Sequence, residues 1–290
     1  MGIEVIRDEM ADLVDPAAEP ELVADGFQFT EGPVWDPAQV CLFFSDIPEN
    51  TIFKWTPEGG IVAYRQPSYH SNGLTLDGQG RLLSCEHSGR RVSVEADGEL
   101  KTLADSYQGK KLNSPNDLVV CQNGDIIFTD PPYGLSSSHG VVAEQELPFL
   151  GVYRLPVGES EPVLLIDDFE RPNGLAITAD EKTLYVDDTQ RGHIRAFDVQ
   201  DDGSLANGRV LAELKGDEDG APDGMKLDRN GNIYCTGPGA VWVFNPAGDL
   251  LGKIRLPLPA ANLNWGGEDR KTLFFTARTD VYRVACKVGG

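Results

Sequence analysis

The stretch Arg171–Thr189 reads RPNGLAITADEKTLYVDDT. It contains two apolar runs of β-prone residues, Leu175–Thr178 and Thr183–Val186, and the polar segment Ala179–Lys182 lies between them. Two such runs joined by a short polar segment predict a β-hairpin with a tight turn. The organisation of the whole chain follows from this unit.

Polar side chains flank the predicted hairpin at one end. Asn173 stands just before the first strand, and Asp187 and Asp188 stand just after the second. In an antiparallel hairpin, the start of the first strand lies beside the end of the second. We therefore expect these three residues to share one edge of the structure.

The same unit occurs six times along the chain. The other five copies span residues 30–46, 71–87, 115–131, 222–238 and 261–277. The residues aligned with Asn173 are Glu31, Asn72, Asn116, Asp223 and Asn262, and the six follow one another at intervals of 39 to 57 residues. A period of roughly 40–50 residues with several strands in each repeat is typical of a β-propeller. The sequence therefore predicts an all-β fold, a six-bladed β-propeller.

The two ends of the chain are predicted to meet in one blade. The last repeat continues into a third strand at Val281–Val284 and then lacks a fourth, whereas a spare strand at Glu21–Ala24 precedes the first hairpin. Pairing these strands would close the ring of blades and protect open sheet edges. We expect an N-terminal extension over residues 1–20, with a short helix at Glu4–Val14, and a single propeller domain over residues 21–290.

The composition argues against several classes of partner. The formal net charge is −21, and basic residues cluster only at Gly89-Arg90-Arg91 and Gly109-Lys110-Lys111. Binding to phosphate backbones needs clustered Lys and Arg, so nucleic acids and anionic membranes are poor partners. No window holds the ~18 uninterrupted apolar residues of a membrane span. The N-terminus lacks the basic start and apolar core of a secretory signal, which favours a cytoplasmic location.

The cysteines and the absence of association motifs fit the same picture. The odd set of cysteines contains no CxxC pair, which favours reduced thiols in a reducing compartment. The chain shows no coiled-coil or other dimer motif, so no obligate protein partner is expected. The five cysteines are Cys41, Cys85, Cys121, Cys235 and Cys286.

The residues aligned with Asn173 form a candidate metal site. In a propeller the innermost strand of each blade lines the central channel, so these six side chains should converge at one end of it. All six carry side-chain oxygens, and Glu31 and Asp223 are negative. Such a set suits a hard divalent cation, with calcium preferred and magnesium, manganese or zinc left open. Ordinary turn chemistry at Asn173-Gly174 and its counterparts is the alternative reading.

Further polar residues follow the second strand of each hairpin and join the same rim. Asp130 and Asp188 are candidates for general acid–base work. His87 and Tyr133, together with Asn72 and Asn116, are candidates for substrate contact. A satisfied polar histidine and a proline-fixed turn at Asp130-Pro131-Pro132 are the alternatives. The longest insertion, residues 131–151, is either a functional lid or a solvated loop.

Several mechanisms find no support in the sequence. It contains no GxSxG nucleophile elbow, no Walker loop and no HExxH motif. Nucleophilic serine or cysteine catalysis is therefore not indicated.

Over about residues 20–285 the chain resembles the SMP-30/gluconolactonase family of six-bladed propellers. The stretches Phe128–Gly134 (FTDPPYG) and Asn264–Gly267 look most like its bacterial gluconolactonase branch. The other matching motifs are Glu31-Gly32-Pro33, Ser114-Pro115-Asn116-Asp117-Leu118, Pro172-Asn173-Gly174-Leu175 and Pro222-Asp223-Gly224.

The resemblance implies that a bound divalent metal polarises the carbonyl of a sugar lactone and that an activated water opens the ring. It implies Glu31, Asn173 and Asp223 as metal ligands, Asn116 beside the metal, and Asp223 also as proton acceptor. The animal members carry an arginine two residues before the Asn116 position, where this chain has Ser114. Substrate details of that branch are therefore not transferred.

Two other functions stay open at this point. One is an organophosphate hydrolase, because phosphotriesterase-like propellers use a similar oxygen-ligated calcium. The other is a calcium-binding propeller without catalysis. Assays of lactones against phosphotriesters would separate the three.

Overall fold

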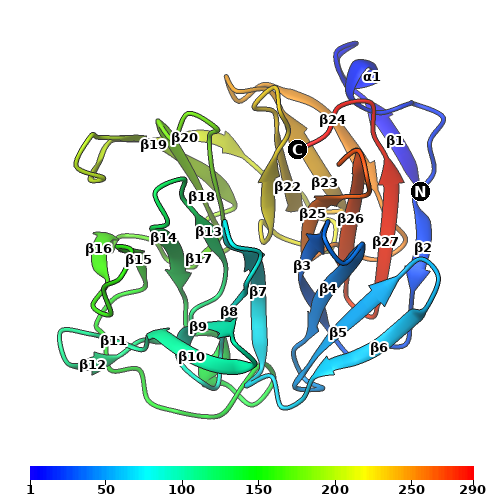
Figure 1. The fold of residues 1–290 in the computed structure, drawn as a ribbon. Coiled ribbons are helices and arrows are strands. Elements are labelled where there is room, and N and C mark those ends of the chain that lie inside the picture. Colours follow the sequence, from blue (N-terminus) through cyan, green and yellow to red (C-terminus); the bar gives the residue numbers. More distant parts are fainter.

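The computed structural model describes residues 1–290 and contains six antiparallel sheets arranged around a central axis (Figure 1). The predicted six-bladed propeller is confirmed. Blade 1 consists of β3 (Thr30–Asp36), β4 (Cys41–Asp46), β5 (Thr51–Thr56) and β6 (Gly60–Arg65). Blade 2 consists of β7 (Ser71–Leu76), β8 (Leu82–Glu86), β9 (Arg91–Ala96) and β10 (Glu99–Ala104). Blade 3 consists of β13 (Leu118–Val120), β14 (Ile126–Asp130), β15 (Gly151–Leu155) and β16 (Val163–Ile166). Blade 4 consists of β17 (Pro172–Ile177), β18 (Thr183–Asp188), β19 (His193–Val199) and β20 (Leu205–Glu213).

The last two blades take up the N-terminus of the chain. Blade 5 consists of β21 (Met225–Leu227), β22 (Ile233–Gly237), β23 (Ala240–Phe244), β24 (Leu250–Arg255) and the N-terminal β1 (Gly2–Val5). Blade 6 consists of β25 (Asn262–Gly266), β26 (Thr272–Ala277), β27 (Asp280–Ala285) and β2 (Glu21–Ala24). A small separate hairpin is formed by β11 (Ser106–Tyr107) and β12 (Lys110–Lys111).

The ring closes as the strand inventory predicts. Strand β2 pairs antiparallel with β27, with Glu21 opposite Arg283 and Leu22 opposite Tyr282. The two ends of the propeller therefore share one sheet, and β2 covers the edge of β27 that would otherwise be open.

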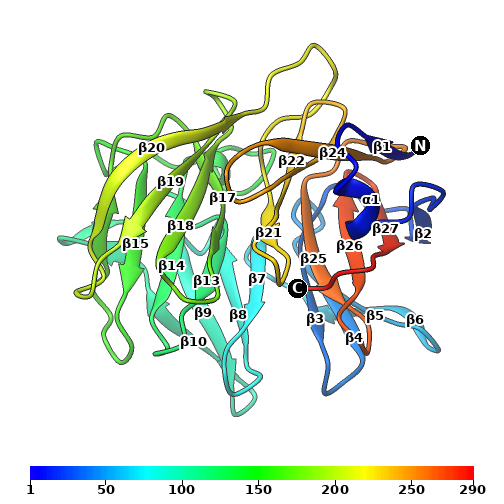
Figure 2. The same ribbon diagram turned by 90° about the horizontal axis from the view of Figure 1, so that it is seen from above.

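The helix expected at Glu4–Val14 is wrong over most of its length. Residues Gly2–Val5 form β1, which pairs with the outer strand β24 of blade 5, and only α1 (Met10–Leu13) is helical. The β-branched residues Ile3 and Val5 favour extended backbone, and the free edge of β24 offers hydrogen-bond partners that an isolated helix lacks. In Figure 2, α1 lies beside β1, β26 and β27.

The core is divided into wedges rather than gathered in one centre. Six apolar clusters fill the spaces between sheets, one for each pair of adjacent blades. Met10 and Leu13 of α1 belong to the cluster between blades 5 and 6, so the helix caps that seam. Each fully buried side chain of this size contributes about 1.5–3 kcal/mol. The wedges hold the blades at fixed angles and leave the axis to polar residues.

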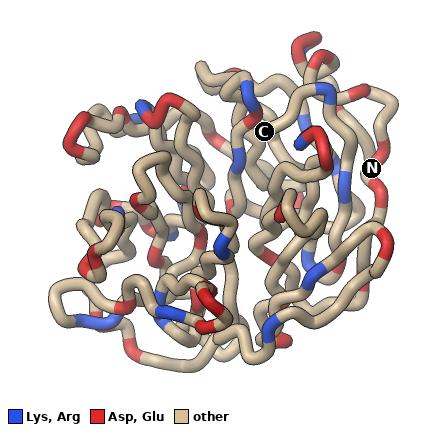
Figure 3. The backbone as a smooth tube through the Cα atoms, viewed as in Figure 1, with Lys and Arg blue, Asp and Glu red and all other residues tan.

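The charged residues are distributed along the whole chain. Lys and Arg occur singly or in short runs among more numerous Asp and Glu (Figure 3). Neither helical segment approaches the length and apolarity that crossing a membrane requires. All five cysteines are free, and only Cys121 is not fully buried.

Candidate active site

The inner strands bring all six aligned residues together at one end of the channel. We call Glu31, Asn72, Asn116, Asn173, Asp223 and Asn262 the axial ring. On one side of it three amides form a directional chain: Asn72 Nδ2 donates to Asn116 Oδ1 at 2.6 Å, and Asn116 Nδ2 donates to Asn173 Oδ1. Asn173 Nδ2 then donates to Thr189 Oγ1 at 3.1 Å. This series of hydrogen bonds fixes the orientation of each amide.

The two acids meet on the other side of the axial ring. Glu31 Oε2 accepts hydrogen bonds from the backbone N–H of Gly32 at 2.5 Å and from Asn262 Nδ2 at 2.9 Å. The Asp223 carboxyl lies next to that of Glu31, although blade 6 separates their two blades. Asp223 is the only member of the ring that is not fully buried.

Glycines allow the inner strands to approach this closely. A Cβ on Gly174 would lie 2.0 Å from the carbonyl oxygen of Asp223, and a Cβ on Gly32 would lie 2.0 Å from that of Asn72. Gly32 also has a φ of 56°, a region that glycine occupies without strain. These glycines are therefore required by the packing of neighbouring blades, which a turn in one hairpin would not require.

Burial makes the two acids of the axial ring reluctant to ionise. It raises the pKa of Glu31 to about 7, helped by the negative charge of Asp117 and opposed by the Gly32 amide, Asn262 and the positive charge of Lys226. Burial also raises the pKa of Asp223 well above its usual range, and the charge of Glu31 is the next largest cause. Two adjoining carboxylates thus need a positive charge if both are to ionise.

The residues of the axial ring fit a hard cation. The structure contains no group of three or more His, Cys, Asp or Glu side chains that could hold a metal, so a cation at the ring would depend on amide oxygens as well. Asn72 Oδ1 is buried without a hydrogen-bond partner, and Glu31 and Asp223 supply two negative charges. An oxygen-only donor set of this kind suits calcium.

His87 connects the axial ring to the insertion between β14 and β15. It is fully buried, and its Nδ1 donates to the carbonyl oxygen of His139 at 2.9 Å. That tautomer leaves Nε2 as an acceptor for Asn72 Nδ2 at 3.2 Å, and Nε2 also lies 3.1 Å from Asn116 Oδ1. Burial lowers the pKa of His87 to about 4, so its imidazole is neutral at physiological pH.

The insertion forms a lid over the axial ring; we call residues 131–150 the lid loop. Its short 3-10 turn, Tyr133–Leu135, packs against His87 and Ser114, and a Cβ on Gly134 would lie 2.4 Å from His87 Cβ. His139 contacts Phe29 edge to face, with ring centroids 5.4 Å apart. The lid loop therefore touches blades 1, 2 and 3.

Tyr133 directs a polar group from the lid loop toward the acids. Its hydroxyl is buried and has no hydrogen-bond partner, while the guanidinium of Arg171 lies 5.3 Å from the centre of its ring. Burial raises the pKa of Tyr133 to about 12, and the negative charge of Asp223 is the next cause. The buried phenol thus lies near the charge of Asp223 and the hydroxyl of Thr189.

The predicted acid–base candidates Asp130 and Asp188 occupy a different setting. Asp188 accepts hydrogen bonds from the backbone N–H groups of Glu170 at 2.9 Å and Arg171 at 3.1 Å. Asp130 Oδ2 accepts one from Asn113 N at 2.8 Å. Asp46 repeats the pattern in blade 1. We call Asp46, Asp130 and Asp188 the strand-end acids. The paired backbone donors of Asp46 and Asp188 favour a structural role, whereas Asp130 Oδ1 is buried without a hydrogen-bond partner.

Sequence reasoning missed four residues around the axial ring. Asp117 follows Asn116 directly and is buried, at a position where four other blades carry glycine. The aspartate at a position that is otherwise mostly glycine is a signal in the sequence that could have identified Asp117. Nothing in the sequence marks the others, whose positions depend on which blades face each other. They are Arg171, Thr189 and Lys226.

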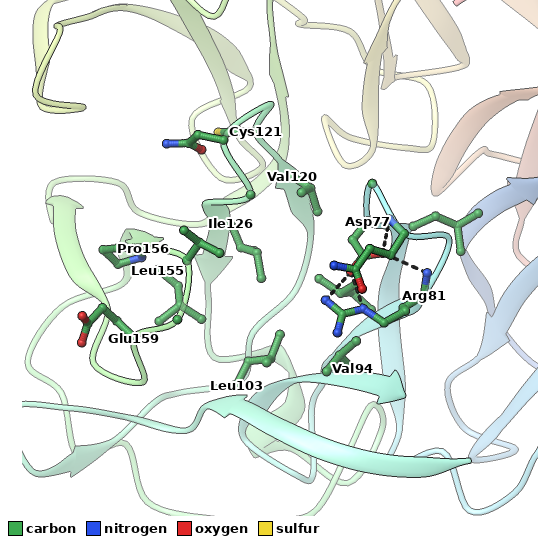
Figure 4. A pocket seen from close by; sticks show the side chains of 18 of the residues that line it. Asp77, Arg81, Val94, Leu103, Val120, Cys121, Ile126, Leu155, Pro156 and Glu159 are labelled. Carbon is green, nitrogen blue, oxygen red and sulfur yellow. Dashed lines mark hydrogen bonds and ion pairs between the residues drawn. The ribbon is translucent and has the colours of Figure 1, made fainter. Parts of the chain in front are cut away.

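A large hollow elsewhere on the surface does not compete with this site. It encloses about 760 Å³ between blades 2 and 3, at the opposite end of the propeller (Figure 4). Its walls carry apolar residues such as Leu103 and Ile126, and the charged pair at its rim, Asp77 and Arg81, is already joined at 2.6 Å. The chemistry-bearing groups gather at the axial ring instead.

Comparisons with known proteins show which proteins the chain as a whole is similar to. Residues 29–279 match the model of the SMP-30/Gluconolactonase/LRE-like region. A gluconolactonase of Zymomonas mobilis is 34% identical over 96% of this chain and 84% of its own length. A lactonase, drp35, of Staphylococcus aureus is 28% identical over 83% of this chain and 74% of its own. The solved structure of a gluconolactonase from Xanthomonas campestris superposes with a TM-score of 0.92 at 35% identity, covering 99% of this chain and 95% of that one.

Proposed function

Because the chain belongs to the SMP-30/gluconolactonase/LRE-like family, we propose that it is a lactonase that hydrolyses sugar lactones at the axial ring. The relatives named as gluconolactonases cover almost the whole chain, which supports lactone hydrolysis. The observation that carries the site is the meeting of buried Glu31 with partly exposed Asp223 among the side-chain oxygens of the axial ring, beneath the lid loop.

A divalent cation completes this proposal. Glu31, Asn173 and Asp223, with Asn116 beside them, would hold it, and when bound it supplies Lewis-acid polarisation of the lactone carbonyl. Calcium is the cation we expect, since all the donors are oxygens.

Asp223 is the residue of this chain best placed to move a proton. It is the ring member with partial exposure, so a water can reach it. In the proposed reaction the water oxygen bonds to the lactone carbonyl carbon while Asp223 takes a proton from that water. The bond between this carbon and the ring oxygen then breaks, Asp223 passes its proton to the leaving ring oxygen, and the product is an open-chain hydroxy acid.

The remaining polar groups serve binding in this proposal. A site that donates and accepts hydrogen bonds at fixed positions discriminates strongly among hydroxylated substrates. The unpartnered hydroxyl of Tyr133 and the amides of Asn72 and Asn116 would bind sugar hydroxyls. The lid loop, held by His87, would exclude bulk water from the reacting carbon.

The proposal is tested with a pH-indicator assay of gluconolactone, xylonolactone and galactonolactone, with and without a chelator. We expect acid release above the spontaneous rate, lost with chelator and restored by calcium. Asp223→Asn should lose this activity. Its matched control is Asp46→Asn, which changes a strand-end acid at the same end of the propeller and should remain active.

Two outcomes would contradict the proposal. Hydrolysis of phosphotriesters but of no lactone would make the chain an organophosphate hydrolase. Calcium binding without turnover of either class would make it a binding protein.

A further inference from the structure

Lys226 spans the channel just beyond the axial ring. It lies in β21, three residues after Asp223, and its Nζ is 3.4 Å from Asp117 Oδ2. Nζ also donates to the carbonyl oxygen of Met225 at 3.0 Å. Asp117 belongs to blade 3 and Lys226 to blade 5, with blade 4 between them. The ion pair therefore joins two blades that are not neighbours, passing the inner strand of blade 4.

The pair occupies the layer beneath the axial ring. Asp117 follows Asn116 directly, and its carboxylate is so close to blade 2 that a Cβ on Gly73 would lie 2.8 Å from Asp117 Oδ1. The side chains of Asp117 and Lys226 are only 3% and 17% exposed. Burying an ion pair costs more desolvation energy than a surface pair does, so stability alone is a weak reason for its presence.

The charge of Lys226 acts on Glu31, one of the two acids that would hold a cation. The negative charge of Asp117 acts on both Glu31 and Asp223, and charges of buried groups are screened far less than charges at the surface. An ammonium near such acids stabilises their ionised forms, and it also repels any second positive charge that approaches.

We infer that Lys226 is a built-in counter-cation of the channel, which weakens divalent-cation binding at the axial ring and stabilises the chain when no cation is bound. This inference rests on the proposed function, because it takes the axial ring as the cation site.

Calcium titration calorimetry on the chelator-treated chain tests the inference with four variants. Lys226→Met removes the charge at similar length, and we expect its calcium Kd to fall about fivefold or more, as the loss of one nearby repulsive charge predicts. Lys226→Arg keeps the charge and should stay within about twofold of the wild type. Asp117→Asn should raise the Kd, and the double variant should return close to the wild-type value, because the two changes cancel in charge.

Melting temperatures measured in chelator report the stability of the chain without bound calcium, and so test the second part of the inference. In chelator, Lys226→Met should melt below the wild type, and saturating calcium should narrow the difference. If Lys226→Met does not fold, the remaining variants still test the inference. Asp117→Asn should raise the calcium Kd, and the double variant should bring it back toward the wild-type value. Equal calcium Kd values across the folded variants, or shifts of Asp117→Asn and Lys226→Met in the same direction, would overturn the inference. A wild-type chain that binds no calcium would instead overturn the cation site itself, and the inference with it.

Discussion

Carboxylates of two kinds gather at the same end of this propeller, and their hydrogen-bond donors tell them apart. The strand-end acids accept backbone N–H groups from the loop that enters their own blade, as Asp188 does from Glu170 and Arg171. Asp223 of the axial ring has no such donor and lies beside a second acid, Glu31. A carboxylate saturated by amides holds a loop in place, whereas one confronted with another carboxylate is poised for a cation or a proton.

The sharpest test of this comparison changes one acid of the axial ring. Asp223→Asn keeps the shape of the side chain but removes the negative charge and the proton acceptor. We expect lactone hydrolysis to fall by about 10³-fold, the range of a lost general base. In chelator the variant should melt above the wild type, because a buried like-charge contact has been removed. Wild-type hydrolysis by this variant would remove Asp223 from the reaction.

The converse test removes a strand-end acid. Asp188→Ala leaves the backbone N–H groups of Glu170, Arg171, Gln190 and Arg191 without their acceptor. We expect the free energy of unfolding to fall by about 2–4 kcal/mol, measured in urea. The rate constant per folded molecule should change little. A large loss of turnover in a variant of normal stability would contradict the structural role.

Asp130 tests the comparison through pH. Burial raises its pKa to about 7, against the lowering effect of the Asn113 amide. Between about pH 4 and pH 7 the folded chain therefore keeps a proton that the unfolded chain releases, so this group makes stability fall as pH rises through that window. Asp130→Asn should remove up to about 1.4 kcal/mol per pH unit of that slope in urea titrations. An unchanged slope would mean that Asp130 ionises normally.

The repeat register made much of this predictable from sequence. The position of Asn173 in one hairpin located its five counterparts, and the missing strand after Val284 located β2 as its partner. The fold and the membership of the axial ring depend on local pattern and on the symmetry of the blades. Both can be read along one chain, because each repeat carries the same information.

Other features depend on contacts that no repeat encodes. Strand β1 forms because the edge of β24 is free, which is a property of the assembled propeller. Asp188 and Asp223 look equally acidic in sequence, and only the direction of nearby N–H groups separates them. Lys226 reaches Asp117 past blade 4, so its role depends on how the blades are arranged around the channel.

The smallest expected effect concerns how the lid loop is fastened to the axial ring. His87→Leu keeps similar bulk but removes both ring nitrogens, leaving the His139 carbonyl and Asn72 Nδ2 without these partners. We expect KM for the lactone to rise about threefold to tenfold, since a lid held less firmly binds substrate less well. Because His87 has a pKa of about 4, the shape of the pH profile above pH 5 should stay as in the wild type. The matched control is His70→Leu, which removes a neighbouring imidazole whose side chain bonds Ser88 and neither the axial ring nor the lid loop, and which should leave KM unchanged. A changed pH profile in His87→Leu would show that the imidazole moves protons in the reaction, and the functional groups of this site would then extend beyond the axial ring.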